Sequence, residues 1–457
     1  MQQNKEQLLA HESIGRLLFK LSVPAVAAQL INMLYNMVDR MYIGRIPDEG
    51  ALALTGMGVS MPVIMLISAF AALVSMGGAP RASIKMGERD MGAAELILGN
   101  CTTALLAISL VLTAVFLTFA EPLLLLFGAS ADTIGYALQY MRIYVTGTVF
   151  VQLALGLNAF ITAQGFAVTS MLTVLIGAIL NIALDPIFIF GLNMGVRGAA
   201  LATVISQAVS AFWVVHFLRG GKTVLRLRLK NMKPVLPVLL PCLALGLAPF
   251  IMQSTESILM IVFNTSLQKY GGDLAVGAMT ILSTVMQFAM LPLIGLFQGA
   301  QPVVSYNYGA QNAGRVKAAF LALLKASVLF SACLWLAVEW FPQIFVRIFT
   351  SDETLVLYAS KYLRIYMAVS CLMGVQLACQ QTFIAIGNAK TSLFLALLRK
   401  VFLLIPLIYL LPAILADKVT AVFLAEPIAD FLAVTATAVL FAVQFRKALR
   451  MMESSAA

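Results

Sequence analysis

Apolar stretches of about 20 residues recur along the whole chain, and each is long enough for one helix to cross a bilayer. We expect twelve spans, at residues 17–43, 54–80, 92–119, 133–161, 167–190, 196–218, 235–265, 274–301, 316–342, 356–385, 391–413 and 418–445. Only 11% of the residues are charged and the mean hydropathy is +0.95, whereas soluble domains carry about 25% charged residues. The sequence therefore predicts an all-α membrane protein with twelve transmembrane helices.

The net charge of +10 is explained by the expected topology. With the N-terminus inside, 21 of the 30 Lys and Arg fall on the inner side: Lys5, Arg16, Lys20, Arg81, Lys85, Arg89, six between Arg219 and Lys233, Arg315, Lys317, Lys325, Lys390, Arg399, Lys400, Arg446, Lys447 and Arg450. Basic residues are enriched in cytoplasmic loops, so both termini are predicted to be cytoplasmic. Because these charges border the bilayer, no nucleic-acid partner is expected. The polar residues 1–16 do not resemble a removed signal peptide.

Enzyme and cofactor chemistry find little support. The chain has two histidines and lacks H-E-x-x-H, G-x-S-x-G and P-loop motifs. Its five cysteines lie in or beside apolar spans, without metal-ligand spacing, and are interpreted as packing residues. Without a nucleotide-binding module, no ATP-driven activity is expected, so any energy input would come from an ion gradient, and no cofactor is expected.

The two halves of the chain are copies of one another. Residues 127–172 and 349–394 align without gaps at an offset of 222 and share 13 of 46 residues. Six spans per half is an even number, so both copies enter the membrane in the same direction and form a parallel repeat with a cleft between them, a transporter architecture. The expected domains are a tail (1–16), an N-lobe (17–218), a basic linker (219–234), a C-lobe (235–445) and a second tail (446–457).

Polar residues in the N-terminal half indicate a cation site. In the first span Tyr35 and Asp39 lie one turn apart on a polar stripe, Asn181 precedes Asp185 by one turn in NIALDPIFIF, and Thr203 lies in the sixth span. Pro186 cannot donate a backbone hydrogen bond and frees a carbonyl oxygen nearby. Two carboxylates facing each other in a low dielectric repel, so either one holds a proton near neutral pH or Na⁺ lies among Asp39, Asn181, Asp185 and Thr203.

The C-terminal half carries a different set of polar residues. Glu256 lies inside the seventh span, and its repeat partner is apolar, which favours a specialised role. The candidate residues for substrate or a second cation are Glu256, Gln253, Met260, Asn264, Ser283 and Gln287. Methionines including Met260 and Met279 are expected along the cleft, where flexible thioethers suit varied apolar cations. Glu426 and Asp430 are expected to pair with Arg399 or Lys400.

Structural roles remain open for each acidic residue. Asp39 lies near a span end, where its carboxylate is less costly and has Arg40 as a possible partner. Asp185 could cap or hydrogen-bond within the bundle. Glu256 could be a neutral acid bonded to Gln253 or Ser257.

Three motifs, by their order and spacing, resemble the multidrug and toxic compound extrusion (MATE) family, most of all its bacterial, MepA-like branch. They are VDRMYIG after the first span, NIALDPIFIF and GLNMGVRGAALAT. The resemblance covers nearly the whole chain. It implies two six-helix lobes around a V-shaped cleft and an antiporter of a bacterial inner membrane, functional as a monomer, that exports cationic lipophilic drugs and dyes in exchange for H⁺ or Na⁺.

By the same resemblance, Asp39, Asn181, Asp185 and Thr203 match the family's N-lobe cation site, with Tyr35 beside it, and Glu256 matches an acidic residue of the seventh helix. One departure weakens a C-lobe Na⁺ site, because residues 362–385 contain no acid to join Glu256. The alternatives are a lipid-linked saccharide flippase, favoured only by Arg399 and Lys400, and a membrane receptor or scaffold, which the lack of large soluble regions disfavours.

Overall fold

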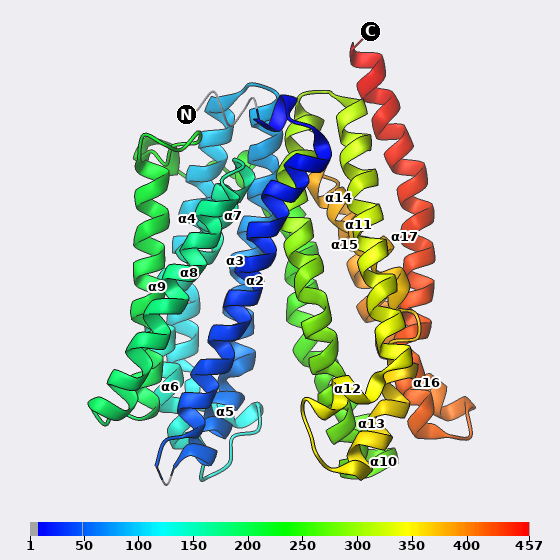
Figure 1. The fold of residues 1–457 in the computed structure, drawn as a ribbon. Coiled ribbons are helices and arrows are strands. Elements are labelled where there is room, and N and C mark those ends of the chain that lie inside the picture. The colour runs from blue at the N-terminus through cyan, green and yellow to red at the C-terminus, as the bar shows by residue number, and fades with distance from the viewer. Residues whose placement is uncertain (1–7, 48, 457) are drawn as a thin grey trace.

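The computed structural model describes residues 8–47 and 49–456, and these are almost entirely helical (Figure 1). The elements are α2 (Ile14–Gly44), α3 (Gly50–Gly87), α4 (Met91–Thr118), α5 (Ala120–Leu126), α6 (Ile134–Thr146), α7 (Thr148–Ala163), α8 (Ala167–Pro186), η1 (Ile187–Gly191), α9 (Val196–Arg219), η2 (Leu229–Met232), α10 (Leu236–Gly309), α11 (Ala313–Trp340), α12 (Pro342–Arg347), α13 (Glu353–Tyr366), η3 (Ser370–Leu372), α14 (Met373–Ala385), α15 (Ala389–Leu397), η4 (Leu398–Leu404), α16 (Ile405–Ile414) and α17 (Lys418–Ala456).

Within the described residues, these elements make the twelve spans predicted from the sequence. Nine helices are long and apolar enough to cross a membrane by themselves, and two bent helix pairs add one span each. The 74-residue α10 supplies two of the twelve, because Gly272 breaks it with φ 63° and ψ −161°. That conformation is open to glycine and strained for other residues, so the chain reverses there between the seventh and eighth spans.

The fourth and tenth spans are not the continuous helices expected at 133–161 and 356–385. α6 and α7 meet at an angle of 56°, and α13 and the η3–α14 segment meet at 47°. In the first of these bends, a Cβ on Gly147 would stand 2.6 Å from Val204 of α9. The break therefore occurs where the sixth span presses against the backbone, a contact that hydropathy does not reveal.

The helices form two lobes, an N-lobe of α2–α9 and a C-lobe of α10–α17, which lie on opposite sides in Figure 1. The start of α2 and the C-terminal end of α17 lie at the same end of the molecule, which we call the terminal end (Figure 1). There one hydrophobic cluster is continuous across the lobes, from Leu17 to Phe441. Toward the opposite end the core divides into a C-lobe cluster around Phe423 and an N-lobe cluster around Tyr140. The lobes thus diverge as a V away from the termini.

Close backbone contact between α3 and α10 joins the lobes at the terminal end. A Cβ on Gly87 would stand 2.0 Å from the carbonyl oxygen of Tyr306, and a Cβ on Gly309 1.9 Å from that of Ile84. The two glycines are 222 residues apart, the offset of the sequence repeat. Only glycine permits such an approach, so the repeat supplies one contact from each lobe.

A short N-terminal segment also bridges the lobes. Arg315 of α11 donates to the carbonyl oxygens of Leu9 at 3.1 Å and Glu12 at 2.9 Å. The Glu12 carboxylate receives hydrogen bonds from Lys20 at 3.1 Å and Arg16 at 3.5 Å, and these cations lower the pKa of Glu12 below its usual value. Residues 1–7, including Lys5, lie outside the described residues. At the other end of the chain, the predicted tail continues α17 as far as Ala456.

Candidate functional site

The predicted N-lobe residues come together from three helices. Asp39 projects from α2, Asn181 and Asp185 from α8, and Thr203 from α9, and all four side chains are buried. The Asn181 amide donates to the Asp185 carboxylate at 3.4 Å and to the Thr203 hydroxyl at 3.3 Å. Asp39 and Asp185 lie close enough to share a hydrogen bond when one of them is protonated. The structure thus assembles the set that the sequence singled out.

Asp39 is not at the exposed interface that its place near a span end suggested. Its side chain is 3% exposed, whereas Arg40 next to it is exposed. Among the described residues, no salt bridge or hydrogen bond joins Arg40 to Asp39, and Asp39 Oδ1 has no hydrogen-bond partner. The pairing of Asp39 with Arg40 at an outer surface, left open above, is therefore wrong.

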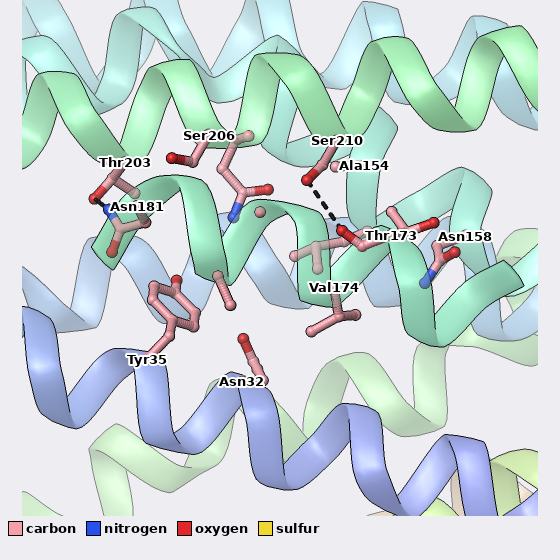
Figure 2. Close-up of a pocket in the computed structure, with 14 residues that line it drawn as sticks. Asn32, Tyr35, Ala154, Asn158, Thr173, Val174, Asn181, Thr203, Ser206 and Ser210 are labelled. Carbon is pink, nitrogen blue, oxygen red and sulfur yellow. Dashed lines mark hydrogen bonds between the residues drawn. The ribbon is translucent and has the colours of Figure 1, made fainter. Parts of the chain in front are cut away.

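A polar cavity of about 50 Å³ lies beside this cluster, between α2, α7, α8 and α9 (Figure 2). One water needs roughly 10–15 Å³ by this measure, so there is room for a few waters or a small hydrated cation. Nine of the fourteen lining residues are polar: Asn32, Tyr35, Asn158, Thr173, Asn181, Thr203, Ser206, Gln207 and Ser210. The Tyr35 hydroxyl lies within hydrogen-bonding reach of Gln207.

Several buried oxygens here have no hydrogen-bond donor. They are Asp39 Oδ1, Asp185 Oδ2, Asn181 Oδ1, Asn158 Oδ1 and Ser206 Oγ. Buried polar atoms are hydrogen-bonded in the large majority of cases. Five unpaired oxygens in one region therefore indicate that a ligand or water binds there. Oxygen ligands of this kind suit a proton, waters or a hard cation.

The sequence analysis missed part of this wall. Asn158 and Ser206 line the cavity with unpaired oxygens, and Tyr140 is buried within reach of the Thr203 hydroxyl. Tyr140 belongs to the repeated stretch 127–172 and has Tyr362 as its counterpart, a likeness that indicates a role in the fold and no site. Asn158 has one polar neighbour at helical spacing, Thr162 at the end of the fourth span, and this pair gave a weaker signal than the acids of the first and fifth spans.

Local backbone geometry follows from Pro186 as expected. Pro186, the residue after Asp185, ends α8, and the π-helical turn η1 begins at the next residue, Ile187. Proline cannot donate to the carbonyl four residues earlier, and single π-turns occur frequently at functional sites. The helix is thus irregular where its carboxylate lies.

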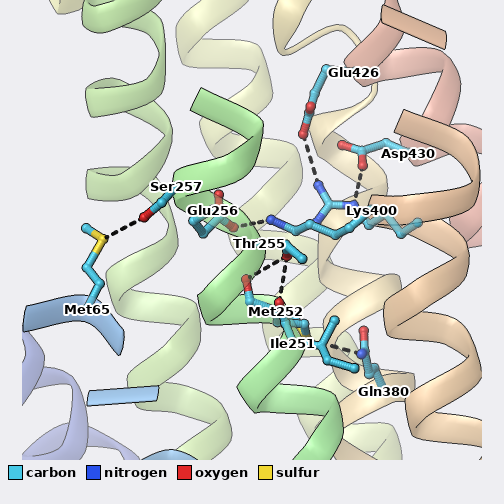
Figure 3. A network of polar contacts seen from close by, with 11 residues as sticks. Met65, Ile251, Met252, Thr255, Glu256, Ser257, Gln380, Lys400, Glu426 and Asp430 are labelled. Carbon is cyan, nitrogen blue, oxygen red and sulfur yellow. Dashed lines mark hydrogen bonds and ion pairs between the residues drawn. The ribbon is translucent and has the colours of Figure 1, made fainter. Parts of the chain in front are cut away.

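In the C-lobe a network of charged residues occupies the interior (Figure 3). Arg399 contacts Asp430 at 2.5 Å and Glu426 at 3.1 Å, as predicted. Lys400 pairs with Glu256 of α10. The interpretation of Glu256 as a neutral acid bonded to Gln253 or Ser257 is therefore wrong, because its partner comes from another helix.

The assignment of Arg399 and Lys400 to the inner surface is also wrong. Both belong to the π-helical segment η4, in the interior of the eleventh span, and their side chains are 14% and 6% exposed. Basic residues are tolerated at such depth when carboxylates pair with them. These partners are supplied by α10 and α17, which lie far away in sequence.

The remaining C-lobe candidates are dispersed. Gln253 and Gln287 are exposed, and Ser283 donates to the carbonyl oxygen of Thr280 at 3.0 Å. Asn264 has a buried oxygen without a donor, and Met260 is partly buried. Met279, expected to line the cleft, is packed in the C-lobe core. Within the described chain, no hydrogen bond joins Glu256 to any of these residues.

Comparison with known proteins decides the family. The MatE family model matches residues 24–187 and 249–410, one stretch in each lobe and together more than two thirds of the chain. This chain belongs to the MATE family of efflux transporters. As a MATE protein it is a multi-pass membrane transporter and not an enzyme, and the family resemblance read from its motifs is confirmed.

Individual MATE relatives match over nearly the full length. The chain is 27% identical over 434 residues to the multidrug export protein MepA of Staphylococcus haemolyticus (strain JCSC1435), covering 94% of both chains. A multidrug resistance MATE family transporter of the MOP superfamily in an outward-facing conformation has a TM-score of 0.90 at 23% identity, covering 97% of this chain and 98% of that one. A MOP superfamily transporter from Pyrococcus furiosus, described as having a binding pocket of reverse polarity, has a TM-score of 0.89 at 23% identity, with 97% and 98% covered. These structural likenesses establish the shared fold.

Proposed function

We propose that this MATE protein is a multidrug efflux antiporter that exports cationic lipophilic drugs and dyes in exchange for H⁺ or Na⁺. The observation that carries the proposal is the pair of buried carboxyls, Asp39 and Asp185, beside a polar cavity with unpaired oxygens. The name of the MepA relative, a multidrug export protein, supports the same activity.

The N-lobe site would bind the coupling ion. Two ionised carboxylates in a medium of low dielectric repel each other strongly. A proton shared by Asp39 and Asp185 relieves this repulsion, and so does Na⁺ held by the oxygens of Asp39, Asn181, Asp185 and Thr203. Tyr35 would close the site toward the cavity. The ion is exchanged in each cycle.

Coupling would run through α2. This helix carries Asp39 and packs against α10 of the opposite lobe, where the Gln29 amide donates to the Gln298 side chain at 3.0 Å. Neutralising the carboxyl pair changes what holds α2 to α8, and this change biases the two lobes between alternative packings. The moving bodies are residues 17–218 and 235–445, joined by the basic linker 219–234.

The charge in the cleft favours a cationic substrate. Glu256 is 57% exposed while its partner Lys400 is 6% exposed, so the accessible group is the acid. Gln253, Met260, Asn264, Ser283 and Gln287 are proposed as the other substrate contacts. The flippase alternative gains from the buried Arg399 and Lys400, but Glu256, Glu426 and Asp430 outnumber these two bases.

We place the transporter in a bacterial inner membrane with both termini cytoplasmic, working as a monomer because one chain supplies both lobes. In that orientation the V opens to the outside. The positive charges at the terminal end support this placement.

The test is ethidium efflux from purified protein in liposomes under an imposed proton or sodium gradient. Efflux should follow one gradient and disappear in Asp185→Asn. The matched control is Asp132→Asn, the same change in an exposed loop, which should transport like wild type. Glu256→Gln should reduce efflux of cations. Full efflux by a folded Asp185→Asn variant would refute the ion-site assignment, and no wild-type efflux under either gradient would favour the flippase.

A further inference from the structure

The ion pair between Lys400 and Glu256 is arranged asymmetrically. The Glu256 side chain, in the part of α10 before Gly272, is 57% exposed, whereas the Lys400 side chain is 6% exposed. A solute in the cleft can reach the acid but not the base. The adjacent residue Ser257 contacts Met65 of the N-lobe at 3.8 Å (Figure 3), so Glu256 lies where the two lobes meet.

The network holds one negative charge in excess. Three carboxylates, Glu256, Glu426 and Asp430, face two bases. Arg399 engages Asp430 through Nε and Glu426 through Nη2. The cluster is therefore one monovalent cation short of neutrality: Lys400 balances Glu256, whereas Arg399 alone faces both Glu426 and Asp430.

A second carboxylate of the network lies beside the base next to Lys400. Glu426 is bound at 3.1 Å to Arg399, the residue that precedes Lys400 in η4. Because a lysine has a flexible four-carbon stem, its ammonium can exchange Glu256 for Glu426 without becoming an unpaired buried charge, which would be costly. Arg399 keeps its 2.5 Å contact with Asp430 in either arrangement.

The repeat shows that these bases are particular to the C-lobe. At the offset of 222, Arg399 and Lys400 correspond to Gly177 and Ala178, two small residues that line the N-lobe cavity. The N-lobe thus leaves room for an exchangeable cation where the C-lobe supplies cations on its own side chains. In η4 the wider π-turn presents the two consecutive bases to different acids.

We infer that Lys400 is an internal counter-cation which occupies Glu256 while the substrate site is empty, and that a monovalent cationic substrate displaces it toward Glu426. Substrate and lysine are mutually exclusive at Glu256, and the single excess charge selects one positive charge per substrate. This inference rests on the proposed function, because it specifies the substrate charge at the same cleft.

Binding of two probes tests the inference. Ethidium carries one positive charge, and propidium carries two on the same ring system, so their affinity ratio isolates charge. The affinities are measured by fluorescence titration of purified protein without any gradient. Lys400→Met should raise the affinity for propidium relative to that for ethidium on the order of tenfold or more, because without Lys400 the cluster is two positive charges short of neutrality. Glu256→Gln should weaken both probes. Lys400→Arg should keep the wild-type ratio, and so should the surface control Lys325→Met.

The outcomes separate cleanly. An unchanged ratio in Lys400→Met, or equal weakening of both probes, overturns the inference, as does wild-type protein that binds neither probe. If gel filtration shows that Lys400→Met does not fold, Glu426→Gln is the test. It should weaken ethidium binding, because the displaced lysine loses its alternative partner. Unchanged ethidium binding overturns the inference. Ethidium efflux by wild-type liposomes reports separately on the proposed function.

Discussion

Replacing Gly309 by alanine should separate the lobes at the terminal end. The new methyl group would stand 1.9 Å from the carbonyl oxygen of Ile84, and it must move about 1.5 Å to reach an ordinary contact of 3.4 Å. The obstacle is backbone, so no side-chain rotation relieves it. The substitution therefore opposes the arrangement in which α3 and α10 touch.

The energetic cost follows from overpacking. Inserting a methyl group into a close-packed interface typically costs about 1–3 kcal/mol, which corresponds to a shift of roughly 5- to 150-fold in a two-state equilibrium. The alternative state, with the lobes apart at this end, does not contain the contact and does not bear the cost. We expect Gly309→Ala to raise its population by a factor in this range.

Cys242 is a native reporter of this opening. It is fully buried near the terminal end of α10, where its carbonyl oxygen faces Gly77 of α3. In a variant lacking the other four cysteines, maleimide labelling of Cys242 should accelerate in Gly309→Ala. The control is Gly58→Ala on α3, where a Cβ meets nothing within 4 Å. Equal labelling rates in Gly309→Ala and the control would refute the reasoning.

Three further predictions concern buried charge and the N-terminal segment. Arg315→Ala removes three hydrogen bonds and should cost about 2 kcal/mol, seen as a lower Tm in detergent, whereas exposed Lys317→Ala should change Tm little. The coupling cation should raise the Tm of wild type by binding the folded state alone, and Asp185→Asn should abolish that increase; an undiminished increase would contradict the site. Arg399→Met strands two buried acids and should cost about 3–5 kcal/mol, with partial recovery of Tm in Arg399→Met/Glu426→Gln; no recovery would argue against the pairing.

Much of the fold and the N-lobe cluster could be predicted from the sequence. A span must be apolar for about 20 residues to cross a bilayer, so the twelve spans are visible in composition alone. Asp185 was identifiable for the converse reason, because an acid inside such a span is costly and needs a function or a partner. Helical spacing then related it to Asn181 on its own helix.

Other features depended on contacts between distant segments. Arg399 and Lys400 were misplaced at the inner surface, because basic residues usually lie at span ends and the carboxylates that stabilise them belong to other helices. Val204 of α9 packs against the backbone at the Gly147 bend, and Asn158 lines the cavity together with residues of α8 and α9. Hydropathy and helical spacing describe one helix at a time, so they do not contain these relations.

The sequence by itself determined that the chain crosses a membrane as two copies of a six-helix unit and that each copy retains acids inside its spans. Both features are visible in the sequence because the hydrocarbon core of a bilayer admits few polar groups. Apolar spans, and any acid inside them, therefore stand out. Only the tertiary structure decided which group each acid faces. In the N-lobe, Asp39 and Asp185 meet each other beside a cavity; in the C-lobe, Glu256 meets Lys400. Pair energies depend on separations of a few ångströms, and packing between helices sets those separations.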